Sequence, residues 1–274
     1  FILSDLVDAQ KSLTAAYPSD GHARPNLYTV QALLAKVYLY LGQYQSAIIA
    51  ANSVIDNGGF SLQSLNNVFI NGSAEAIWQI PSNSSYSQTV EGSTFIPYNA
   101  TSLPNYYLSA QLLSAFEPGD LRKTSWLNFS RVNIGGVPAT FYYPFKYKQR
   151  VAGQAPVEGY SILRLAEIYL IRAESLAQTN KIAEALVDVN KIRSRANLSN
   201  VNSTVKEVIL NAILHERQVE LFCESGNRWF DLKRSNTINS MLNNKVGWIP
   251  SAALFPIPVA ERQANPALTQ NPEY

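Results

Sequence analysis

The stretch TVQALLAKVYLYLGQYQSAIIAANSVI, residues 29–55, decides the fold class of this chain. Its large and small apolar side chains fall where a tetratricopeptide repeat places its packing residues, with a turn at residues 41–44 between two helical runs. Small residues such as Ala47 and Ala51 let two antiparallel helices approach closely. The run Asn-Gly-Gly at residues 57–59 ends the second helix, because glycine adopts the left-handed conformation common at helix ends.

A second stretch with related spacing covers residues 161–197. Asn180 stands where the first pair has its turn glycine, and asparagine tolerates the left-handed region at modest cost. A third helical segment, residues 205–222, has apolar side chains spaced to face one side. The sequence therefore predicts a mainly α fold built from tetratricopeptide-like helix pairs, with a few short strands.

Between the two pairs, residues 81–160 change character. Ser, Asn, Gly and Pro are dense there, and eight of the fifteen tyrosines lie in this region. Long loops in compact domains are usually functional or disordered, and abundant aromatic residues argue against disorder. Local patterns predict a strand over residues 76–80, a helix over 105–116, and a hairpin over 130–147 that turns at two adjacent glycines.

The composition excludes several classes of partner and site. Lys plus Arg number 22 and Asp plus Glu 20, for a net charge of +2, so neither nucleic acid nor an anionic membrane surface is indicated. The single cysteine, Cys223, excludes an internal disulfide and a thiolate metal cluster, and we expect a buried, inert thiol. The chain begins within an amphipathic stretch without an initiator Met, so we expect the natural protein to continue upstream.

Acidic residues recur every fourth position at Glu216, Glu220 and Glu224. Such carboxylates can serve as a general acid and base for glycoside cleavage, or as an ion-pair lattice with nearby arginines that locks helices together, which we favour. The pair His215-Glu216 lacks the second histidine of a zinc-protease helix, and His22 lies in a polar turn where we expect it to be solvated. We predict no catalytic residue, no metal and no cofactor.

Three blocks of sequence, together with the chain end, carry a family resemblance. The blocks are ALLAKVYLYLGQY at residues 32–44, RLAEIYLIRAE at 164–174, HERQVELFCESGNRWFDLKR at 215–234, and the end segments LFPIP at 254–258 and NPALTQNPEY at 265–274. In this order they resemble the SusD/RagB family, and the last block with the chain end is the specific part. The resemblance covers almost the whole chain but corresponds to the C-terminal half of a usual family member.

The resemblance implies a fold, a location and partners. It implies a single SusD/RagB-like domain over residues 1–274, whose parts are helices at 1–62, an aromatic loop-rich region at 63–160, helices at 161–246 and a Pro-rich tail at 247–274 that wraps the helices as an extended segment. Family members are outer-membrane lipoproteins on the extracellular face that capture glycans or peptides and lid a SusC-like TonB-dependent transporter. A glycan ligand, that transporter, a lipid anchor on an absent N-terminal part and no enzymatic activity are therefore expected.

A sugar receptor needs flat aromatic platforms beside amide groups, because a sugar ring has an apolar face and a rim of hydroxyls. The loop-rich region supplies both kinds of side chain. The candidate ligand-binding residues are Tyr86, Tyr98, Asn99, Tyr106, Tyr107, Trp126, Asn128 and Tyr142. Two other tryptophans, Trp78 and Trp229, are expected to pack against the scaffold.

The leading prediction is a non-enzymatic protein that binds an oligosaccharide in the loops. One alternative is a tetratricopeptide scaffold that binds a peptide or protein in a helical groove lined by Tyr38, Asn52 and Arg172. A second alternative is a hydrolase that uses Glu216 and Glu220. Mapping the ligand to the loops or to the helices separates the first two, and turnover that is lost in a Glu→Gln variant would support the third.

Overall fold

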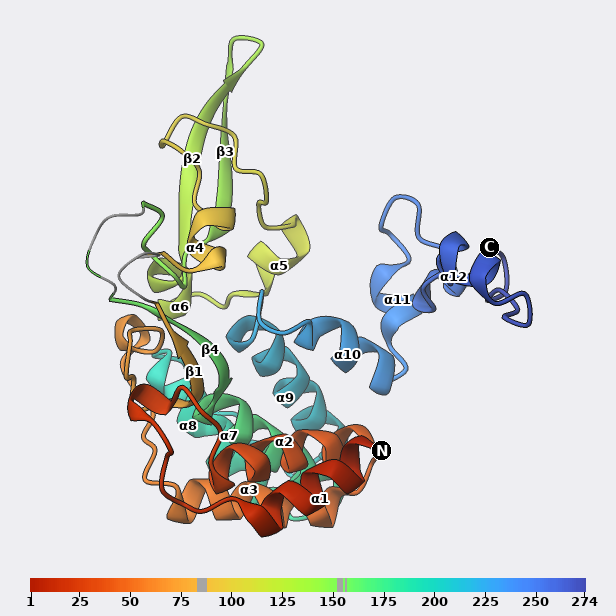
Figure 1. Ribbon diagram of the computed structural model, residues 1–274. Coiled ribbons are helices and arrows are strands. Elements are labelled where there is room, and N and C mark those ends of the chain that lie inside the picture. Colours follow the sequence, from red (N-terminus) through yellow and green to blue (C-terminus); the bar gives the residue numbers. More distant parts are fainter. Residues whose placement is uncertain (83–87, 152–154, 156) are drawn as a thin grey trace. The chain divides into compact units, whose positions relative to one another are not determined.

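The computed structural model describes residues 1–82, 88–151, 155 and 157–274 (Figure 1). It divides into two compact units, residues 1–223 and residues 224–274. The larger unit holds long helices and two small antiparallel sheets, and the smaller one holds short helices joined by loops. The fold is mainly helical with few short strands, as the sequence predicted. The expectation of one domain over the whole chain stays a prediction.

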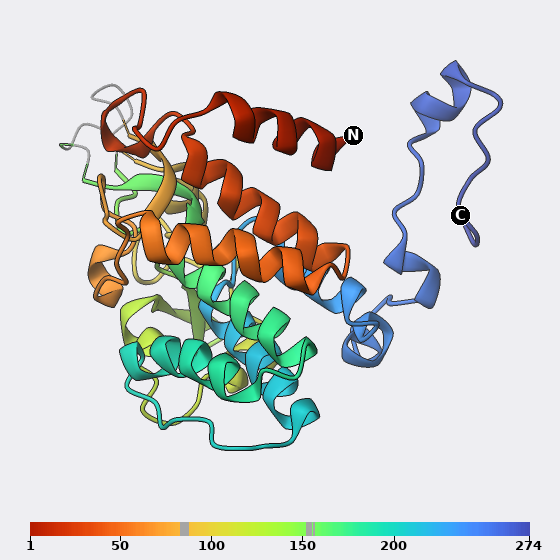
Figure 2. The same cartoon turned by 90° about the horizontal axis from the view of Figure 1, so that it is seen from below.

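Six long helices form the scaffold of the larger unit. They are α1 (Ile2–Ser12), α2 (Leu27–Tyr40), α3 (Tyr44–Asn57), α7 (Leu165–Gln178), α8 (Ile182–Arg195) and α9 (Lys206–Glu220). Contacts run from α2 to α3, from α3 to α7 and from α7 to α8 and α9, and Figure 2 shows the row of stacked helices. The two helix pairs predicted from the repeat-like spacing are therefore confirmed.

Local sequence explains where these helices begin and end. The Asn26 side chain accepts a hydrogen bond from the Thr29 N–H at 3.0 Å, and the Thr29 hydroxyl accepts one from the Asn26 N–H at 3.3 Å, which caps α2 at both groups. The turn after α2 places Gly42 at a φ of 69°, and the equivalent turn after α7 places Asn180 at 61°. The predicted exchange of asparagine for glycine is confirmed.

Small residues bring the helices together, and large ones fill the space between them. Ala35, Ala47 and Ala166 have no exposed surface, and neither do Ile168 and Ile171 on α7. Fully burying one Ile side chain contributes roughly 1.5–3 kcal/mol to folding. Helix α7 is buried along most of its length, because α3, α8 and α9 all pack on it.

The two sheets each contain two antiparallel strands. Strand β1 (Ala76–Pro81) pairs with β4 (Gly159–Arg164), which leads directly into α7. Strand β2 (Leu127–Ile134) pairs with β3 (Val137–Pro144) in a hairpin. Gly135 and Gly136 form its turn with φ of 61° and 92°, as a two-residue hairpin turn of the mirror-image type requires. The predicted strand and hairpin turn are confirmed.

The loop-rich region contains short helices rather than the longer helix predicted over residues 105–116. These elements are η2 (Leu65–Asn67), α4 (Val90–Phe95), α5 (Ala110–Ala115) and α6 (Leu121–Ser125), and a further short helix, η1 (Asp20–His22), lies near the chain start. Helix α5 begins late because the Ser109 side chain caps it by accepting from the Leu112 N–H at 3.2 Å. The preceding Leu108 N–H donates to the Tyr142 carbonyl of β3 at 2.7 Å, so the chain just before α5 bonds to the hairpin instead of forming the first turn of a helix.

The smaller unit contains α10 (Asn227–Arg234), α11 (Ile238–Leu242), η3 (Pro250–Ala253) and α12 (Val259–Ala264). Trp229 is half-buried against Trp248 and Phe255, with ring centroids 6.2 and 5.1 Å away. The Gln270 side chain bonds the Ile257 N–H at 2.8 Å and the Ile257 carbonyl at 3.0 Å, which joins the two end segments of the family resemblance. The tail is thus partly helical, and its wrapping of the helices stays a prediction.

Two predictions for single residues are wrong. His22 is half-buried rather than solvated, because its Nδ1 lies 2.6 Å from the Ala76 carbonyl oxygen and its ring stacks on Tyr17 at 4.3 Å. Cys223 is exposed rather than buried, since α9 ends at Glu220 and Cys223 lies in a left-handed turn with a φ of 56°. Trp78 is half-buried on the helical core, as expected. Within the described residues, no helix combines the length and apolar character needed to cross a membrane.

Candidate functional site

Two acidic residues of α9, Glu216 and Glu220, lie inside the protein. Glu216 and Glu220 have no exposed surface. Arg122 Nη1 lies 2.5 Å from Glu216 Oε1 and 3.0 Å from Glu220 Oε2, and Arg164 Nη1 lies 2.5 Å from Glu220 Oε1. Arg195 also pairs with Glu220. The preferred interpretation, an ion-pair lattice, is confirmed for Glu216 and Glu220, although its arginines come from other segments than the residues near α9.

The pKa values of the two carboxylates are shifted in opposite directions. Burial alone raises the pKa of Glu220, but Arg195, Arg164 and Arg122 outweigh burial and hold that pKa well below its ordinary value. Burial raises the pKa of Glu216, and Arg122 offsets it incompletely. A carboxyl pair with opposite shifts is typical of general acid and base catalysis, but catalysis needs contact with a substrate. Complete burial prevents that contact here.

The loop-rich region carries a group of exposed and half-buried rings, which we call the aromatic surface. Its members are Phe95, Tyr98, Tyr106, Tyr107, Phe129 and Phe141. Tyr98, Tyr106 and Tyr107 are 81%, 59% and 55% exposed, far more than a ring that serves packing.

Ring contacts hold these side chains in defined orientations. Phe95 meets Tyr106 edge to face at 6.1 Å, and Tyr107 meets Phe141 at 5.0 Å. Edge-to-face pairs at such distances are favourable, because the positive edge of one ring meets the negative face of the other. Phe129 lies 5.7 Å from Tyr142, its partner across the hairpin.

Backbone hydrogen bonds fasten the loop after α4 to the hairpin. The Arg131 N–H of β2 donates to the Ala100 carbonyl at 2.9 Å, in addition to the bond between Leu108 and Tyr142. Figure 1 shows this loop beside β2 and β3. Asn99 Oδ1 accepts from the N–H and the hydroxyl of Thr101 at 2.9 and 2.7 Å, which fixes the turn next to Tyr98.

Helix α4 packs tightly against the segment that follows the hairpin. A Cβ atom added to Gly92 would meet the Gln149 carbonyl oxygen at 2.1 Å, so glycine is required for this close approach. One residue further along, Arg150 Nε donates to the Ile96 carbonyl at 3.0 Å, and its guanidinium lies 5.2 Å above the Tyr98 ring centroid. The aromatic surface is therefore built on several segments that hold one another in place.

The predicted ligand-binding residues fall into four groups, of which the last is Trp126 alone. Tyr98, Asn99, Tyr106 and Tyr107 are exposed on the loop, as a binding role requires. Asn128 and Tyr142 are half-buried on the hairpin, and Asn128 Oδ1 accepts from the Phe129 N–H at 2.8 Å. Tyr86 lies outside the described residues.

Trp126 does not belong to the aromatic surface. It has no exposed surface, its Nε1–H donates to the Leu65 carbonyl at 2.9 Å, and its ring lies 5.7 Å from Phe69 and 6.4 Å from Phe222. The prediction that Trp126 touches ligand is therefore wrong, because this tryptophan is the centre of a second hydrophobic core.

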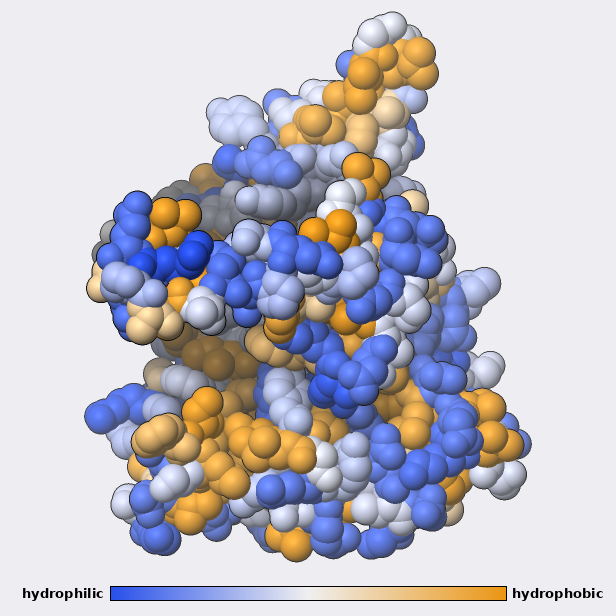
Figure 3. All heavy atoms as spheres, turned by 90° about the vertical axis from the view of Figure 1, so that its right-hand side faces the viewer, coloured by the Kyte–Doolittle hydropathy of each residue, from blue (hydrophilic) through white to orange (hydrophobic). Residues whose placement is uncertain are grey.

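Sequence reasoning missed Phe129, Arg131 and Phe141 of the hairpin. The alternation of a strand was the available signal, since residues 129, 131 and 133 share one face of β2. Figure 3 shows apolar residues toward the hairpin tip, where Ile134 and Val137 are 53% and 67% exposed.

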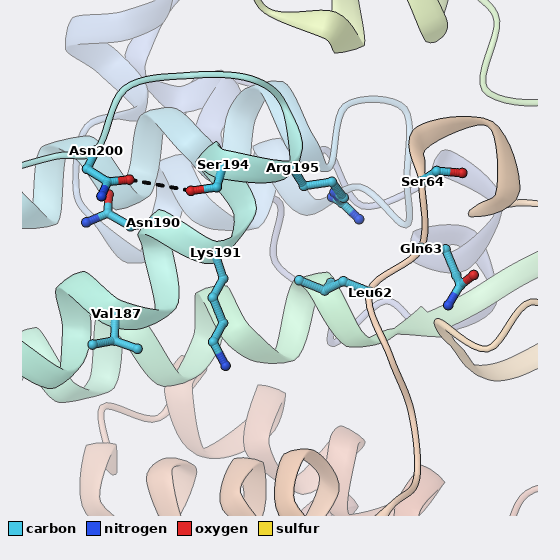
Figure 4. Close-up of a pocket in the computed structure, with 9 residues that line it drawn as sticks. All are labelled: Leu62, Gln63, Ser64, Val187, Asn190, Lys191, Ser194, Arg195 and Asn200. Carbon is cyan, nitrogen blue, oxygen red and sulfur yellow. Dashed lines mark hydrogen bonds between the residues drawn. The ribbon is translucent and has the colours of Figure 1, made fainter.

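Two surface hollows lie on the helical scaffold in the part of the chain that the structure describes. The larger, of about 520 Å³, lies between α8 and the segment after α3, and polar side chains such as Asn190 and Ser194 line it together with Leu62 and Val187 (Figure 4). Asn190 in its wall pairs with the Val201 backbone through both its amide groups at 3.1 and 2.8 Å, and Ser194 donates to Asn200 at 3.5 Å. These side chains brace the loop after α8.

The smaller hollow, of about 240 Å³, is lined by Asn52 and Arg172, two of the three groove residues expected for a peptide-binding scaffold. Arg172 donates to Asp188 at 2.7 and 2.8 Å and to Asn52 at 2.7 Å. The guanidinium N–H groups of Arg172 therefore link α7 to α3 and α8. The third expected residue, Tyr38, packs against the core.

In the described residues, no three His, Cys, Asp or Glu side chains are grouped so that they could hold a metal ion.

Comparisons with known proteins identify the family of this chain. The model of the SusD family matches residues 91–274. SusD-like protein P38 of Formosa agariphila is 25% identical over 331 residues, which cover 100% of this chain and 64% of that relative. The chain thus spans about two thirds of the length of this relative.

Solved structures share the fold. A SusD superfamily protein from Parabacteroides distasonis superposes with a TM-score of 0.81 at 23% identity, covering 100% of this chain and 68% of the other. A laminarin-binding SusD-like protein superposes with a TM-score of 0.76, also at 23% identity, with coverage of 100% and 68%.

Proposed function

This chain belongs to the SusD family, and from that premise we propose that it binds a glycan through the aromatic surface. The observation that carries the proposal is the exposure of Tyr98, Tyr106 and Tyr107 on a loop that hydrogen bonds fasten to the hairpin. Rings held in place but left open offer a stacking platform that loses little conformational entropy when a ligand binds. A laminarin-binding protein shares this fold, which supports a sugar as the ligand.

The chemistry of a sugar matches the surface. The axial C–H groups of a pyranose stack on an aromatic ring, and the hydroxyl rim requires hydrogen-bond partners. Asn99, exposed beside Tyr98, and the tyrosine hydroxyls supply donors and acceptors. Asn128 and Tyr142 extend the platform onto the hairpin.

The role in nutrient uptake follows from the family. We propose that the protein works on the extracellular face of the outer membrane, where a lipid anchor holds it. There it captures an oligosaccharide and delivers it to a SusC-like TonB-dependent transporter. The protein acts by binding and breaks no bond, which agrees with the complete burial of Glu216 and Glu220.

A peptide-binding scaffold is the second candidate function. The hollow lined by Asn52 and Arg172 supports it, because it lies between helices α3, α7 and α8 as a tetratricopeptide groove would. The Arg172 hydrogen bonds to Asp188 and Asn52 argue against it, since a peptide must compete with them.

The test is affinity electrophoresis of the chain against soluble plant, algal, fungal and bacterial polysaccharides. Retardation by one glycan that is lost in the double variant Tyr106→Ala/Tyr107→Ala supports the proposal. Ile49→Ala, an exposed apolar change on α3, is the matched control and should retain binding. Binding that survives the tyrosine variant but is lost in Asn52→Ala places the ligand in the helical hollow instead.

A further inference from the structure

The segment that contains the hairpin of the aromatic surface carries positive charges only. From residue 123 to residue 157 the sequence contains no Asp or Glu, yet it holds five Lys or Arg residues. The whole chain has a net charge of just +2, so this segment concentrates positive charge. Such local fields attract ligands of opposite sign and raise their local concentration.

One of these cations, Arg150, is stacked on an exposed ring. Its guanidinium lies 5.2 Å from the centroid of Tyr98, and its Nε is held by the Ile96 carbonyl. Among the described residues, no carboxylate oxygen lies within 4.0 Å of this guanidinium. The sequence between the described ranges, residues 83–87, 152–154 and 156, contains no acidic residue either.

A second cation, Arg131, repeats the arrangement on the hairpin. Its guanidinium lies 5.3 Å from the centroid of Phe129, which is 39% exposed. Arg131 is exposed, and in the part of the chain that the structure describes it also has no carboxylate partner within ion-pair distance. Its backbone N–H bonds Ala100, two residues from Tyr98, so both arginines border the loop that carries this tyrosine.

Other cations nearby are engaged elsewhere. Lys146 is buried, and its ammonium donates to the carbonyls of Glu220 and Phe222 at 2.8 and 2.9 Å. Lys148 donates to Asn66 Oδ1. Arg131 and Arg150 are therefore the positive groups that combine an exposed ring with an unneutralised guanidinium.

Guanidinium groups bind carboxylate and sulfate oxygens through two parallel N–H donors, and they do so more strongly than they bind neutral acceptors. A sugar with a carboxylate or sulfate presents an oxyanion beside the apolar ring face that stacks on an aromatic side chain. Each ring and its arginine match these two features. Glu91 is the one acidic residue in the sequence from residue 76 to residue 116, so little negative charge opposes such a ligand.

We infer that the aromatic surface selects an anionic glycan, with Arg150 and Arg131 binding the carboxylate or sulfate groups while Tyr98 and Phe129 stack on the sugar rings. This inference rests on the proposed glycan-binding function and specifies its ligand class. It goes beyond that function, because stacking on aromatic rings alone would accept neutral and charged sugars alike.

The experiment compares polymers that differ in charge but share a backbone. Polygalacturonate is paired with its carboxyl-reduced form, and a sulfated galactan with its desulfated form, in calorimetric titrations of the chain. The inference expects the charged member of at least one pair to bind about tenfold more tightly or better at low salt. Which pair responds distinguishes a uronate ligand from a sulfated one. The preference should shrink as the ionic strength rises from about 0.05 to about 0.5 M.

Variants assign the effect to the two arginines. Arg150→Gln and Arg131→Gln should each reduce affinity for the charged polymer several-fold. Arg150→Lys should lose less affinity than Arg150→Gln, since lysine keeps the positive charge but lacks the two parallel N–H donors of a guanidinium. Lys123→Gln removes one exposed positive charge from α6 in the same acid-free segment, so it is the control for net charge and should bind normally.

Three results would overturn the inference or its premise. Equal affinity for both members of each pair, with glycan binding retained, contradicts the anionic ligand but leaves the proposed function in place. An equal loss in Lys123→Gln and Arg150→Gln indicates unspecific charge attraction and contradicts the role of the arginines. A failure to bind every polymer in these pairs and in the wider glycan panel contradicts the proposed function itself.

Discussion

Trp126 donates its indole N–H to the Leu65 carbonyl at 2.9 Å, which ties the start of the β2–β3 hairpin to the short helix η2, 61 residues earlier in the chain. The ring also packs against Phe69 and Phe222, so three distant segments meet at one side chain. The hairpin that carries two of the six rings of the aromatic surface is therefore anchored in a hydrophobic core of its own.

Replacing Trp126 should destabilise the fold without removing a ligand contact. Trp126→Ala is expected to lower the free energy of unfolding by about 3–5 kcal/mol, since it leaves a cavity and an unpaired carbonyl. Trp126→Phe should cost less, because it keeps most of the ring volume. Urea denaturation followed by circular dichroism measures both. An unchanged unfolding midpoint in Trp126→Ala would mean that the side chain is not part of this core.

The buried ion pairs make stability depend on pH through Glu220. Its pKa lies below the ordinary value because Arg195, Arg164 and Arg122 surround it, so the native state binds its proton less readily than the unfolded chain does. Its contribution is fully present above the ordinary glutamate pKa of 4.5 and is lost as the pH falls toward the lower native value. Melting temperature measured against pH should fall less steeply in acid for Glu220→Gln than for the wild type.

At neutral pH the same variant should be less stable than the wild type by about 3–5 kcal/mol, since Arg122, Arg164 and Arg195 each lose one of their buried carboxylate partners and too little negative charge remains to balance them. Glu216→Gln is the comparison, because the raised pKa of Glu216 means that ionising this carboxyl lowers the free energy of unfolding, whereas ionising Glu220 raises it. Its ionised form costs stability at neutral pH, and that cost is relieved as the pH falls. Glu216→Gln should therefore destabilise less than Glu220→Gln, and the reverse order would contradict the assigned directions.

The close contact at Gly92 predicts a local effect on the aromatic surface. In Gly92→Ala the new methyl group meets the Gln149 backbone, which cannot move aside like a flexible side chain, so α4 and Phe95 must shift. The expected cost is roughly 1–3 kcal/mol, with faster hydrogen exchange in residues 90–108. Ser93→Ala on the same helix is the control and should leave exchange unchanged. Normal protection in Gly92→Ala would show that α4 does not depend on this contact.

Local patterns predicted much of the scaffold. The repeat-like spacing located both helix pairs, Asn180 substituted for glycine as expected, and the glycine pair located the hairpin turn. Each of these features depends on the few residues beside it in the sequence. The predictions for His22 and Cys223 were wrong, because burial depends on distant neighbours such as Ala76, which lies 54 residues from His22.

The candidate site was predictable in composition but not in arrangement. An excess of tyrosine in one loop-rich region pointed to the segment that carries exposed rings, and Tyr98, Tyr106 and Tyr107 are open as expected. Trp126 appeared equivalent to them in sequence, yet contacts with residues near 65 and 222 bury it. The arginines of the surface were missed because their roles depend on which ring each one covers.

The most direct test of the glycan-binding account is a calorimetric titration of Tyr98→Ala and Tyr98→Phe. The ligand is the polysaccharide that retards the wild-type chain in affinity electrophoresis. The account predicts that Tyr98→Ala loses about tenfold in affinity, which corresponds to about 1.4 kcal/mol, while Tyr98→Phe keeps the stacking platform and most of the affinity. The unfolding midpoints of both variants should match the wild type, because the ring is 81% exposed. Wild-type affinity in Tyr98→Ala, with binding lost in Asn52→Ala, would contradict the account and place the ligand on the helices.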